Sequence, residues 1–477
     1  MNHSDRRTKI VCTIGPSTRS EENIERLFLA GMNVARLNFS HGSHDDHMQT
    51  IRWVRKVARK YHYSIPILMD LQGPKIRVGQ MKDGMQVVQA GQELEITAEA
   101  VEGTTERIPI DFPDLTRDAA VGDTILIDDG LLELKVEAKK GESLITRVVV
   151  GGELKSRKGV NLPNVNIRTS AITEKDYKDL EFGLSQDVDF VALSFVRSPR
   201  DIQEITSRIR AAGSNAGVIA KIEKPEALLV IDDIIEETDG IMVARGDLGI
   251  EIPTEQVPIV QKQIIERCRM AGKPVITATQ MLDSMIHNPR PTRAESSDVA
   301  NAVMDGTDAV MLSGETAAGA YPFEAVSTMG RIIRSVEASH DKLYDSLKFR
   351  RPDWREKQVI ESISHSCVTL ANHVDAKVIS TITHSGSTAR RIAKYRPRVP
   401  IVAFTESQKV RRQLNLVWGV QSVRIDELFD TDQSVRLMEE HLKSNQLVES
   451  GDRVVFATGM PIAQRGRTNM VMVSNVE

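Results

Sequence analysis

Three charged side chains close a short and otherwise apolar segment of the sequence. Residues 217–224 read GVIAKIEK, so Lys221, Glu223 and Lys224 come where a buried strand would end. Residues two apart in a strand project from the same face, which places Lys221 and Glu223 together. Charged side chains are seldom buried unless they are paired or coordinate a ligand. The segment therefore predicts a chemical site, with a surface Lys–Glu pair as the alternative.

The next apolar segment supplies a second carboxylate. Residues 240–248 end in ARGDL and place Asp247 at the same end of a neighbouring strand. Two carboxylates are the minimum protein contribution to an Mg²⁺ or Mn²⁺ site that substrate oxygens and water complete. Gly246 allows the backbone to approach a ligand, so N–H groups there could hold a carboxylate or phosphate. We expect Glu223 and Asp247 to bind the metal.

Other apolar segments also end in polar side chains. An arginine in such a place suits bidentate contact with phosphate, whereas a lone hydroxyl is as readily explained by capping a helix. The residues concerned are Arg36, Asn38 and Ser40 in NVARLNFSHG, Asp70 with the following Lys75 and Arg77, Thr279 in ITATQ, and Ser313 and Glu315 in LSGET. Their shared position at strand ends favours one common site over unrelated capping roles.

The charges of these residues indicate the chemistry. The cations Arg36, Lys75, Arg77 and Lys221 outnumber the acids unless a divalent metal and a phosphorylated anion are added. Phosphoryl transfer needs such positioning and neutralisation of charge. The chain contains no GxxxxGK[ST] loop, so side chains and metal would have to hold the phosphate.

Eight short apolar segments must position these residues. They are 9–15, 32–40, 65–71, 188–195, 217–223, 240–248, 274–280 and 308–315. Helical patterns lie between them at 21–31, 47–60, 174–184, 201–213 and 257–272. Eight such units predict a (β/α)₈ barrel, in which the active site lies at the carboxyl ends of the strands. A doubly wound sheet is the alternative.

Two further domains are predicted. The alternation is interrupted after the third strand by β patterns and turns, which indicates an inserted β domain at 73–169 placed over the site as a lid. The barrel would then comprise 1–72 and 170–340. After a polar stretch, residues 341–477 alternate again and predict a C-terminal α/β domain.

Composition excludes several classes of protein. The 477 residues carry 62 basic and 66 acidic side chains, and a net charge of −4 argues against nucleic-acid or membrane partners. Three cysteines without CxxC spacing argue against a disulfide framework or thiolate metal site. No segment has the length of a membrane span or the pattern of a signal peptide, so we expect a cytoplasmic location.

Long motifs give the chain a family resemblance. NVARLNFSHG, DLQGPKIR, VIAKIEKPEAL, IMVARGDLGIEIP, ATQMLDSMI, PRPTRAE and MLSGETAAG occur in this order. They resemble pyruvate kinase over essentially the whole chain. The resemblance implies a barrel, a β lid after its third strand and a C-terminal regulatory domain. It also implies phosphoryl transfer from phosphoenolpyruvate to ADP, giving pyruvate and ATP in the last step of glycolysis.

The resemblance implies a role for each site residue. Glu223 and Asp247 would hold Mg²⁺ (or Mn²⁺), and Lys221 would stabilise the phosphoryl group and the developing enolate. Arg36 would contact the substrate phosphate, with the Gly246 backbone and Thr279 at its carboxylate. The nucleotide would be served by Asn38, His41, Arg77 and Lys158. Ser313 and Glu315 would join Thr279 in a proton relay, whose final donor stays open.

One motif departs from the K⁺-dependent branch of the family. Those members have Thr-Lys-Gly-Pro-Glu where this chain has Leu71-Gln72-Gly73-Pro74-Lys75. In them oxygens at the positions of Asn38, Ser40 and Asp70 accompany the ion. A lysine ammonium at position 75 is a tethered monovalent cation. We therefore expect Lys75 to replace K⁺.

The C-terminal domain carries a candidate effector site. THSGST, comprising Thr383, His384, Ser385, Gly386, Ser387 and Thr388, lies between a strand and a helix, where N–H groups and hydroxyls can cradle phosphate. The resemblance implies an allosteric phosphorylated effector at this loop and a homotetramer. An ordinary capped helix start is the alternative for this loop. Arg465 or Arg467 could close over the effector, with a solvated basic loop as the alternative.

Two other functions are compatible with parts of this pattern. A barrel aldolase or lyase would act on a pyruvate enolate, and its Schiff-base form would need a neutral Lys221. A metabolite sensor would keep the fold without catalysis. The filled catalytic positions argue against the sensor, and the neighbouring carboxylates argue against a neutral lysine. A metal-dependent aldolase would not need a neutral lysine, but it gives no role to the lid or the nucleotide residues.

Overall fold

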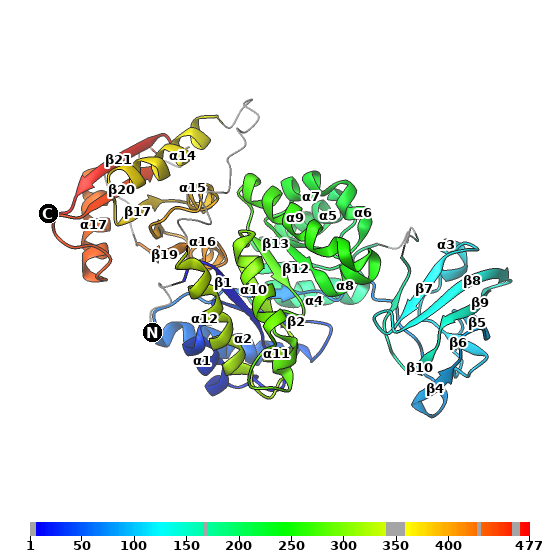
Figure 1. The fold of residues 1–477 in the computed structure, drawn as a ribbon. Coiled ribbons are helices and arrows are strands. Elements are labelled where there is room, and N and C mark those ends of the chain that lie inside the picture. The colour runs from blue at the N-terminus through cyan, green and yellow to red at the C-terminus, as the bar shows by residue number, and fades with distance from the viewer. Residues whose placement is uncertain (1–5, 164, 166–169, 340–357, 427–430, 460–467) are drawn as a thin grey trace.

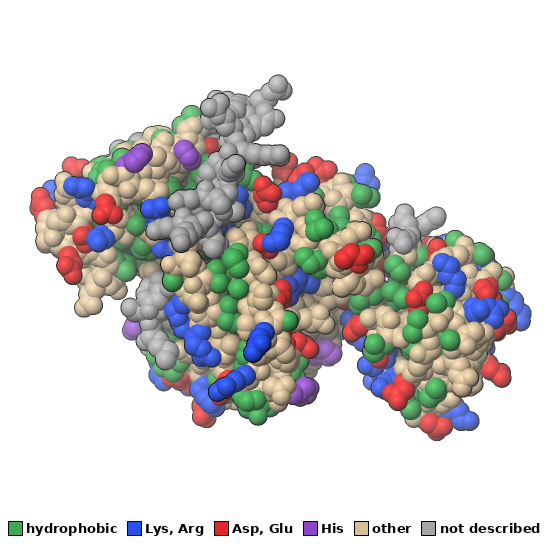
Figure 2. All heavy atoms as spheres, in the orientation of Figure 1, with side chains coloured by type: hydrophobic (Ala, Val, Ile, Leu, Met, Phe, Trp, Pro, Cys, Tyr) green, Lys and Arg blue, Asp and Glu red, His purple; other side chains and the backbone are tan. Residues whose placement is uncertain are grey.

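The computed structural model describes residues 6–163, 165, 170–339, 358–426, 431–459 and 468–477. A barrel lies in the centre, with the inserted β domain at one end and the C-terminal α/β domain at the other (Figure 1). Each of these three parts has at least one hydrophobic core of its own. The inserted domain appears in Figure 2 as a lobe set apart from the barrel.

Eight parallel strands close into the central barrel. Around the ring they follow the order β1, β2, β3, β12, β13, β14, β15 and β16, and β16 pairs with β1. They are β1 (Lys9–Thr13), β2 (Val34–Asn38), β3 (Ile67–Asp70), β12 (Phe190–Leu193), β13 (Gly217–Ile222), β14 (Gly240–Ala244), β15 (Val275–Ala278) and β16 (Ala309–Leu312). Each lies within one of the eight predicted segments. The barrel prediction is confirmed, and the closed ring excludes a doubly wound sheet.

Helices cover the outside of the barrel. These helices include α1 (Glu21–Ala30), α2 (His44–Lys60), α4 (Glu174–Ser185), α5 (Pro199–Ala211), α7 (Ile231–Glu237), α9 (Val257–Ala271), α10 (Arg293–Met304) and α12 (Pro322–Glu337). Short helices α6 (Pro225–Leu229), α8 (Arg245–Glu251) and α11 (Gly314–Ala317) follow strand ends. The helix predicted at 47–60 begins earlier, because Ser43 and Asp46 form a capping box.

The inserted domain is built almost entirely of strands. A six-stranded sheet contains β5 (Glu93–Thr97), β6 (Arg107–Pro109), β7 (Thr124–Ile127), β8 (Leu132–Lys140), β9 (Ser143–Val150) and β11 (Val160–Asn161), and β4 (Met85–Val88) pairs with β10 (Gly152–Lys155). The one α-helix there is the single turn α3 (Leu115–Asp118), among the residues that the structure describes. The prediction of a β insertion after the third strand is confirmed.

The C-terminal domain holds a five-stranded sheet. The strand order is β19 (Val420–Arg424), β18 (Ile401–Thr405), β17 (Val378–Ile382), β20 (Arg453–Thr458) and β21 (Met470–Asn475), with only β21 antiparallel. Its helices are α14 (Gln358–His373), α15 (Ser387–Ala393), α16 (Gln408–Leu414) and α17 (Thr431–Ser444). The prediction of a C-terminal α/β domain is confirmed.

This domain is docked on the amino ends of the barrel strands. Lys9 Nζ at the start of β1 donates to Val420 O at 2.8 Å, and Trp418 N donates to Asp308 Oδ1 at 3.1 Å. The carboxyl ends of the barrel strands therefore face away from the C-terminal domain. The sequence boundaries proposed at 72/73, 169/170 and 340/341 stay predictions, and residues 166–169 and 340–357 lie outside the described residues.

Cys12, Cys268 and Cys367 are buried and free. In the part of the chain that the structure describes, no helix is both long and apolar enough to cross a membrane.

Candidate active site

A cavity of about 700 Å³ opens at the carboxyl ends of the barrel strands. Side chains that reach it follow most of the strands in the ring, as expected for an active site in this fold. The predicted site residues that line it are Arg36, Asn38, Ser40, His41, Lys75, Lys221, Glu223, Asp247, Thr279 and Ser313. Predicted residues from the second to the eighth strand are thus brought into one cavity.

Lys221 is the ionic centre of this cavity. Its Nζ lies 2.9 Å from Glu223 Oε1 and 3.2 Å from Asp70 Oδ1, and it donates to Ser194 Oγ at 2.7 Å. Burial lowers the pKa of Lys221, but Asp70 and Glu223 raise it more, so the net pKa lies above the ordinary lysine value. Lys221 is therefore a charged ammonium group at neutral pH.

Asp70 joins Lys221 to Arg36. Arg36 Nε donates to Asp70 Oδ2 at 2.7 Å, and Arg36 Nη1 donates to Thr13 Oγ1 at 2.8 Å. Burial raises the pKa of Asp70, but Lys221 and Arg36 lower it more, and the net pKa is lowered. A buried carboxylate thus holds two cations in place, and both cations line the cavity.

Glu223 and Asp247 fit a divalent cation. Glu223 is 1% exposed, and its Oε2 accepts from Phe195 N at 2.7 Å. Burial raises the pKa of Glu223, with Asp247 adding to the increase, so a cation between the carboxylates would relieve their repulsion. Among the described residues no group of three or more His, Cys, Asp or Glu side chains could hold a metal. Two carboxylates with substrate oxygens match the predicted site.

Thr279 lies in a strained backbone. Its φ is +75°, and that of Gln280 is +55°, both in the region that L-residues seldom adopt. Arg245 supports this turn by donating to Thr279 O at 2.7 Å and to Ala278 O at 3.2 Å, and Asp298 binds the same guanidinium. A Cβ at position 246 would lie 2.6 Å from Thr279 Cγ2, so any side chain there would force Thr279 to shift.

Glu315 stands behind the cavity and does not line it. Its Oε2 accepts from Ser313 N at 2.7 Å and its Oε1 from Leu282 N at 3.1 Å. Burial raises the pKa of Glu315 above its ordinary value. The structure brings Ser313 and Thr279 to the cavity, while Glu315 ties the loops that carry them.

Two predicted nucleotide residues lie away from the cavity. Arg77 Nη1 donates to Arg157 O at 3.1 Å, and Lys158 Nζ lies 2.9 Å from Asp128 Oδ1, both within the inserted domain. A β-bridge between Arg77 and Gly159 brings Arg77 next to Lys158. The two side chains are therefore together but not at the barrel, and their role stays a prediction.

Sequence reasoning missed Thr13 and Ser194. Thr13 accepts from Arg36, and Ser194 accepts from Lys221 while donating to Leu71 O at 2.7 Å. Both stand at the carboxyl ends of the predicted strands 9–15 and 188–195. The rule that identified Arg36 and Lys221, polar groups at strand ends, would have found them too.

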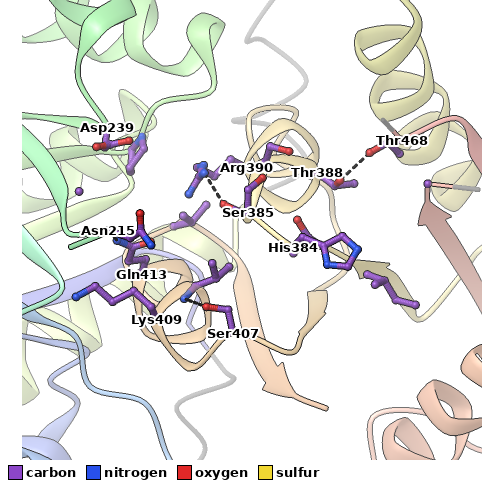
Figure 3. A pocket seen from close by; sticks show the side chains of 18 of the residues that line it. Asn215, Asp239, His384, Ser385, Thr388, Arg390, Ser407, Lys409, Gln413 and Thr468 are labelled. Carbon is purple, nitrogen blue, oxygen red and sulfur yellow. Dashed lines mark hydrogen bonds between the residues drawn. The ribbon is translucent and has the colours of Figure 1, made fainter. Parts of the chain in front are cut away.

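The predicted effector loop lines a second cavity of about 730 Å³ between the C-terminal domain and the barrel. Thr383, His384, Ser385, Ser387 and Thr388 face it, and Gly386, with φ +81°, caps α15 without lining it. Figure 3 shows that barrel residues, including Asn215 and Asp239, surround it from the other side. Arg465 and Arg467 lie outside the described residues.

Comparison with known proteins agrees with this architecture. Residues 5–326 match the family model "Pyruvate kinase, barrel domain", and residues 361–474 match "Pyruvate kinase, alpha/beta domain". This chain belongs to the pyruvate kinase family. Pyruvate kinases of Staphylococcus aureus strains MRSA252 and USA300 are each 48% identical over 472 residues, which cover 98% of this chain and 80% of those proteins. A crystal structure of a Cryptosporidium parvum pyruvate kinase has a TM-score of 0.93 at 39% identity, covering 100% of this chain and 97% of that one.

Pyruvate kinases are phosphotransferases, and membership of the family makes the chain an enzyme of this class. The metabolite sensor is therefore excluded. The aldolase or lyase alternative is not what the family indicates, and the ammonium form of Lys221 argues separately against a Schiff base.

Proposed function

We propose that the chain transfers the phosphoryl group of phosphoenolpyruvate to ADP in an Mg²⁺- or Mn²⁺-dependent reaction, giving pyruvate and ATP. The observation that carries the proposal is the buried Lys221 ammonium group between Asp70 and Glu223, on the cavity that Asp247 also lines. A fixed cation there can stabilise charge that develops on the transferred group and the enolate oxygen.

Each residue has a proposed part in the reaction. Glu223 and Asp247 would hold the divalent ion, which when bound neutralises phosphoryl charge. Arg36, already fixed by Asp70 and Thr13, contacts the substrate phosphate. Thr279 and the backbone at Gly246 hold the substrate carboxylate.

The remaining residues serve the nucleotide and the final proton. Asn38 and His41 line the cavity and would meet ADP there. Arg77 and Lys158 would join them only if the inserted domain moves toward the barrel. Ser313 and Thr279 border the cavity as members of the proton relay, with Glu315 holding the Ser313 backbone.

The proposal extends to regulation and assembly. A phosphorylated effector would bind the cavity lined by the 383–388 loop, and Lys75 would take the place of K⁺. The enzyme would act as a cytoplasmic homotetramer.

One assay tests the central proposal. Pyruvate formation from phosphoenolpyruvate is measured with and without ADP, and again after Mg²⁺ is removed by a chelator. We expect pyruvate to form only when ADP and Mg²⁺ are both present, with one ATP formed per pyruvate. Pyruvate formation that is independent of ADP would instead point to a phosphatase, with water as the acceptor of the phosphoryl group.

A further inference from the structure

Lys224, the third charged residue of GVIAKIEK, has no part in the proposed function, yet its side chain is buried. Its Nζ donates to Glu251 Oε1 at 2.7 Å. Glu251 is the last residue of α8 and is only 5% exposed. A buried ion pair is rarely a net source of stability, because taking two charges out of water costs about as much as their attraction returns. Another role is therefore needed to explain the pair.

The Lys224–Glu251 ion pair joins the two segments that carry the proposed metal ligands. Lys224 directly follows Glu223 and caps the start of α6. Asp247 lies four residues before Glu251 on α8, and residues four apart on an α-helix lie on the same face. The strands that lead to these two segments, β13 and β14, are neighbours in the barrel. The ion pair thus bridges the chain just beyond each metal ligand.

Asn161 connects the inserted domain to this ion pair. It lies in β11, which pairs with β7 of the same domain, and its Nδ2 donates to Glu251 Oε1 at 3.0 Å. One carboxylate oxygen therefore accepts from the barrel and from the inserted domain at once. The other oxygen, Glu251 Oε2, is buried and has no hydrogen-bond partner among the described residues. No hydrogen bond at Oε2 would therefore hold the carboxylate in place if either donor moved.

A small cleft of about 30 Å³ lies where these parts meet. Lys224 and Asp247 line it from the barrel, and Asn161 lines it from the inserted domain. Asp247 also lines the catalytic cavity, so its side chain stands between the cleft and that cavity. A rotation of the inserted domain would act on α8 through the Asn161–Glu251 hydrogen bond, one helical turn from Asp247.

We propose that Lys224 and Glu251 are positioning residues for the divalent cation, and that Asn161 makes their effect depend on the inserted domain. The ion pair holds Glu223 and Asp247 at the separation that suits the metal. Groups behind metal ligands commonly orient those ligands, and their loss weakens metal binding by about 10–100-fold. This inference rests on the proposed metal site.

The test is the binding of Mn²⁺ to the full chain without substrates, measured from the electron paramagnetic resonance signal of the free ion. Lys224→Met combined with Glu251→Met removes both charges, so the net charge near the metal is unchanged and no buried charge is left unpaired. The matched control is Lys56→Met combined with Glu21→Met, which removes an exposed ion pair between α2 and α1. Thermal unfolding is measured on every variant.

We expect the Mn²⁺ dissociation constant to rise about tenfold or more in Lys224→Met/Glu251→Met, and to stay unchanged in the control pair. Lys224→Arg keeps the ion pair and should retain most of the wild-type affinity. A role in folding alone would lower Tm without changing the affinity for Mn²⁺. Unchanged affinity in the folded double variant would overturn the proposal.

Asn161→Ala tests the connection to the inserted domain, because it changes no charge and leaves the buried ion pair in place. We expect its Mn²⁺ dissociation constant to rise about threefold, since only part of the free energy of a hydrogen bond to a charged group reaches the metal. This rise should be absent in the Lys224→Met/Glu251→Met background, where the acceptor is gone. Gln89→Ala, which removes an exposed amide of the same domain, is the control.

The outcomes for Asn161→Ala and for the wild type separate the two proposals. Equal Mn²⁺ affinity in Asn161→Ala and wild type would overturn the connection between the inserted domain and the metal site. This comparison holds even where the double variant does not fold. Absence of Mn²⁺ binding to the wild type would refute the proposed metal site, and this inference with it.

Discussion

Lys221 shows how neighbouring residues set the state of a single side chain. A lysine in an apolar pocket tends to lose its proton, yet here Asp70 and Glu223 raise the pKa of Lys221 above the ordinary value. A permanent ammonium group suits the stabilisation of a developing anion better than nucleophilic attack on a carbonyl.

Replacing Lys221 should therefore affect turnover more than folding. We expect Lys221→Met to lower kcat by about 10²–10³-fold, because a preorganised charge in such a site supplies a factor of this size. Steady-state assays with saturating substrates and a thermal unfolding control make the test. Lys262→Met, an exposed lysine on α9, is the matched control. Near-normal turnover in folded Lys221→Met would show that the charge is not used.

Lys75 bears on the need for a monovalent cation. Its side chain is exposed and lines the cavity, so an ammonium group is available where K⁺-dependent relatives have a glutamate. We expect substantial activity when tetramethylammonium or Tris is the only cation besides Mg²⁺, and a new K⁺ requirement in Lys75→Glu. The K⁺ requirement of Lys75→Glu should be incomplete, because Leu71 still stands where the K⁺-dependent relatives have a threonine.

Two results would contradict the proposed role of Lys75. Activation of the wild type by about 100-fold or more on adding K⁺, comparable to one strong electrostatic contact, would mean that the ion is still needed. Equal K⁺ response in wild type and Lys75→Glu would mean that Lys75 does not act at this place.

The sequence predicted the cavity residues well but not their partners. Strand periodicity was enough to place Lys221, Glu223 and Arg36 at one end of the barrel. It could not show that Asp70 binds two cations at once, or that Arg245 supports a strained Thr279, since these contacts join residues far apart in the chain. The positions of Arg77 and Lys158 depend on how the inserted domain lies, which no local pattern encodes.

At the scale of elements, hydrogen bonds tie the inserted domain to the barrel near both points where the chain passes between them. Gly73 N donates to Asp176 Oδ1 at 3.2 Å at the start of α4, and Asn161 Nδ2 donates to Glu251 Oε1 at 3.0 Å on α8. These few contacts leave the domain's own core separate from that of the barrel. Such an arrangement favours movement of the inserted domain about its two connections to the barrel.

Removing the inserted domain should separate folding from catalysis. We expect that replacing residues 73–169 with a short Gly/Ser linker leaves a folded barrel, because the β3–β12 pairing does not use the domain. ADP phosphorylation should be lost with Arg77 and Lys158. Circular dichroism and the coupled assay measure the two properties. If the shortened protein phosphorylated ADP normally, the inserted domain would have no catalytic role.

At the scale of the whole molecule, ionic contacts join the C-terminal domain to the barrel. Arg412 Nε on α16 donates to Asp189 Oδ1 at 2.5 Å, and Asp189 is fully buried just before β12. The same helix carries Lys409 and Gln413, which line the cavity of the 383–388 loop. The far end of β12 leads to Ser194, the partner of Lys221. These contacts place a continuous set of residues between the two cavities.

Regulation through the 383–388 loop should depend on its hydroxyls. We expect a phosphorylated sugar or nucleotide to lower the apparent KM for phosphoenolpyruvate, and Ser385→Glu or Ser387→Glu to abolish that response by placing a carboxylate where phosphate would bind. Saturation curves with and without each compound make the measurement. Ser444→Glu, exposed on α17, is the control. A metabolite screen without any effect on the wild type would refute the idea.

The three-part architecture could be predicted from the sequence. The alternation of strand and helix patterns gives way to β patterns in the inserted domain, and it resumes after a polar stretch in the C-terminal domain. The docking of the C-terminal domain could not be predicted. It depends on single long-range pairs such as Arg412 with Asp189 and Arg396 with Asp308, which leave no periodic signal in either domain.

The closed ring of strands also sets the order of events during synthesis. Lys9 pairs with Ala309, so the barrel cannot close until β16 has left the ribosome, and β3 must wait for the inserted domain before it meets β12. At about 5–20 residues per second, β1 would be without its β16 partner for roughly 15–60 s. The inserted domain has a core of its own and can fold during that interval. We expect truncated chains that end before β16 to aggregate or to be held by chaperones, even though most of the barrel is already made.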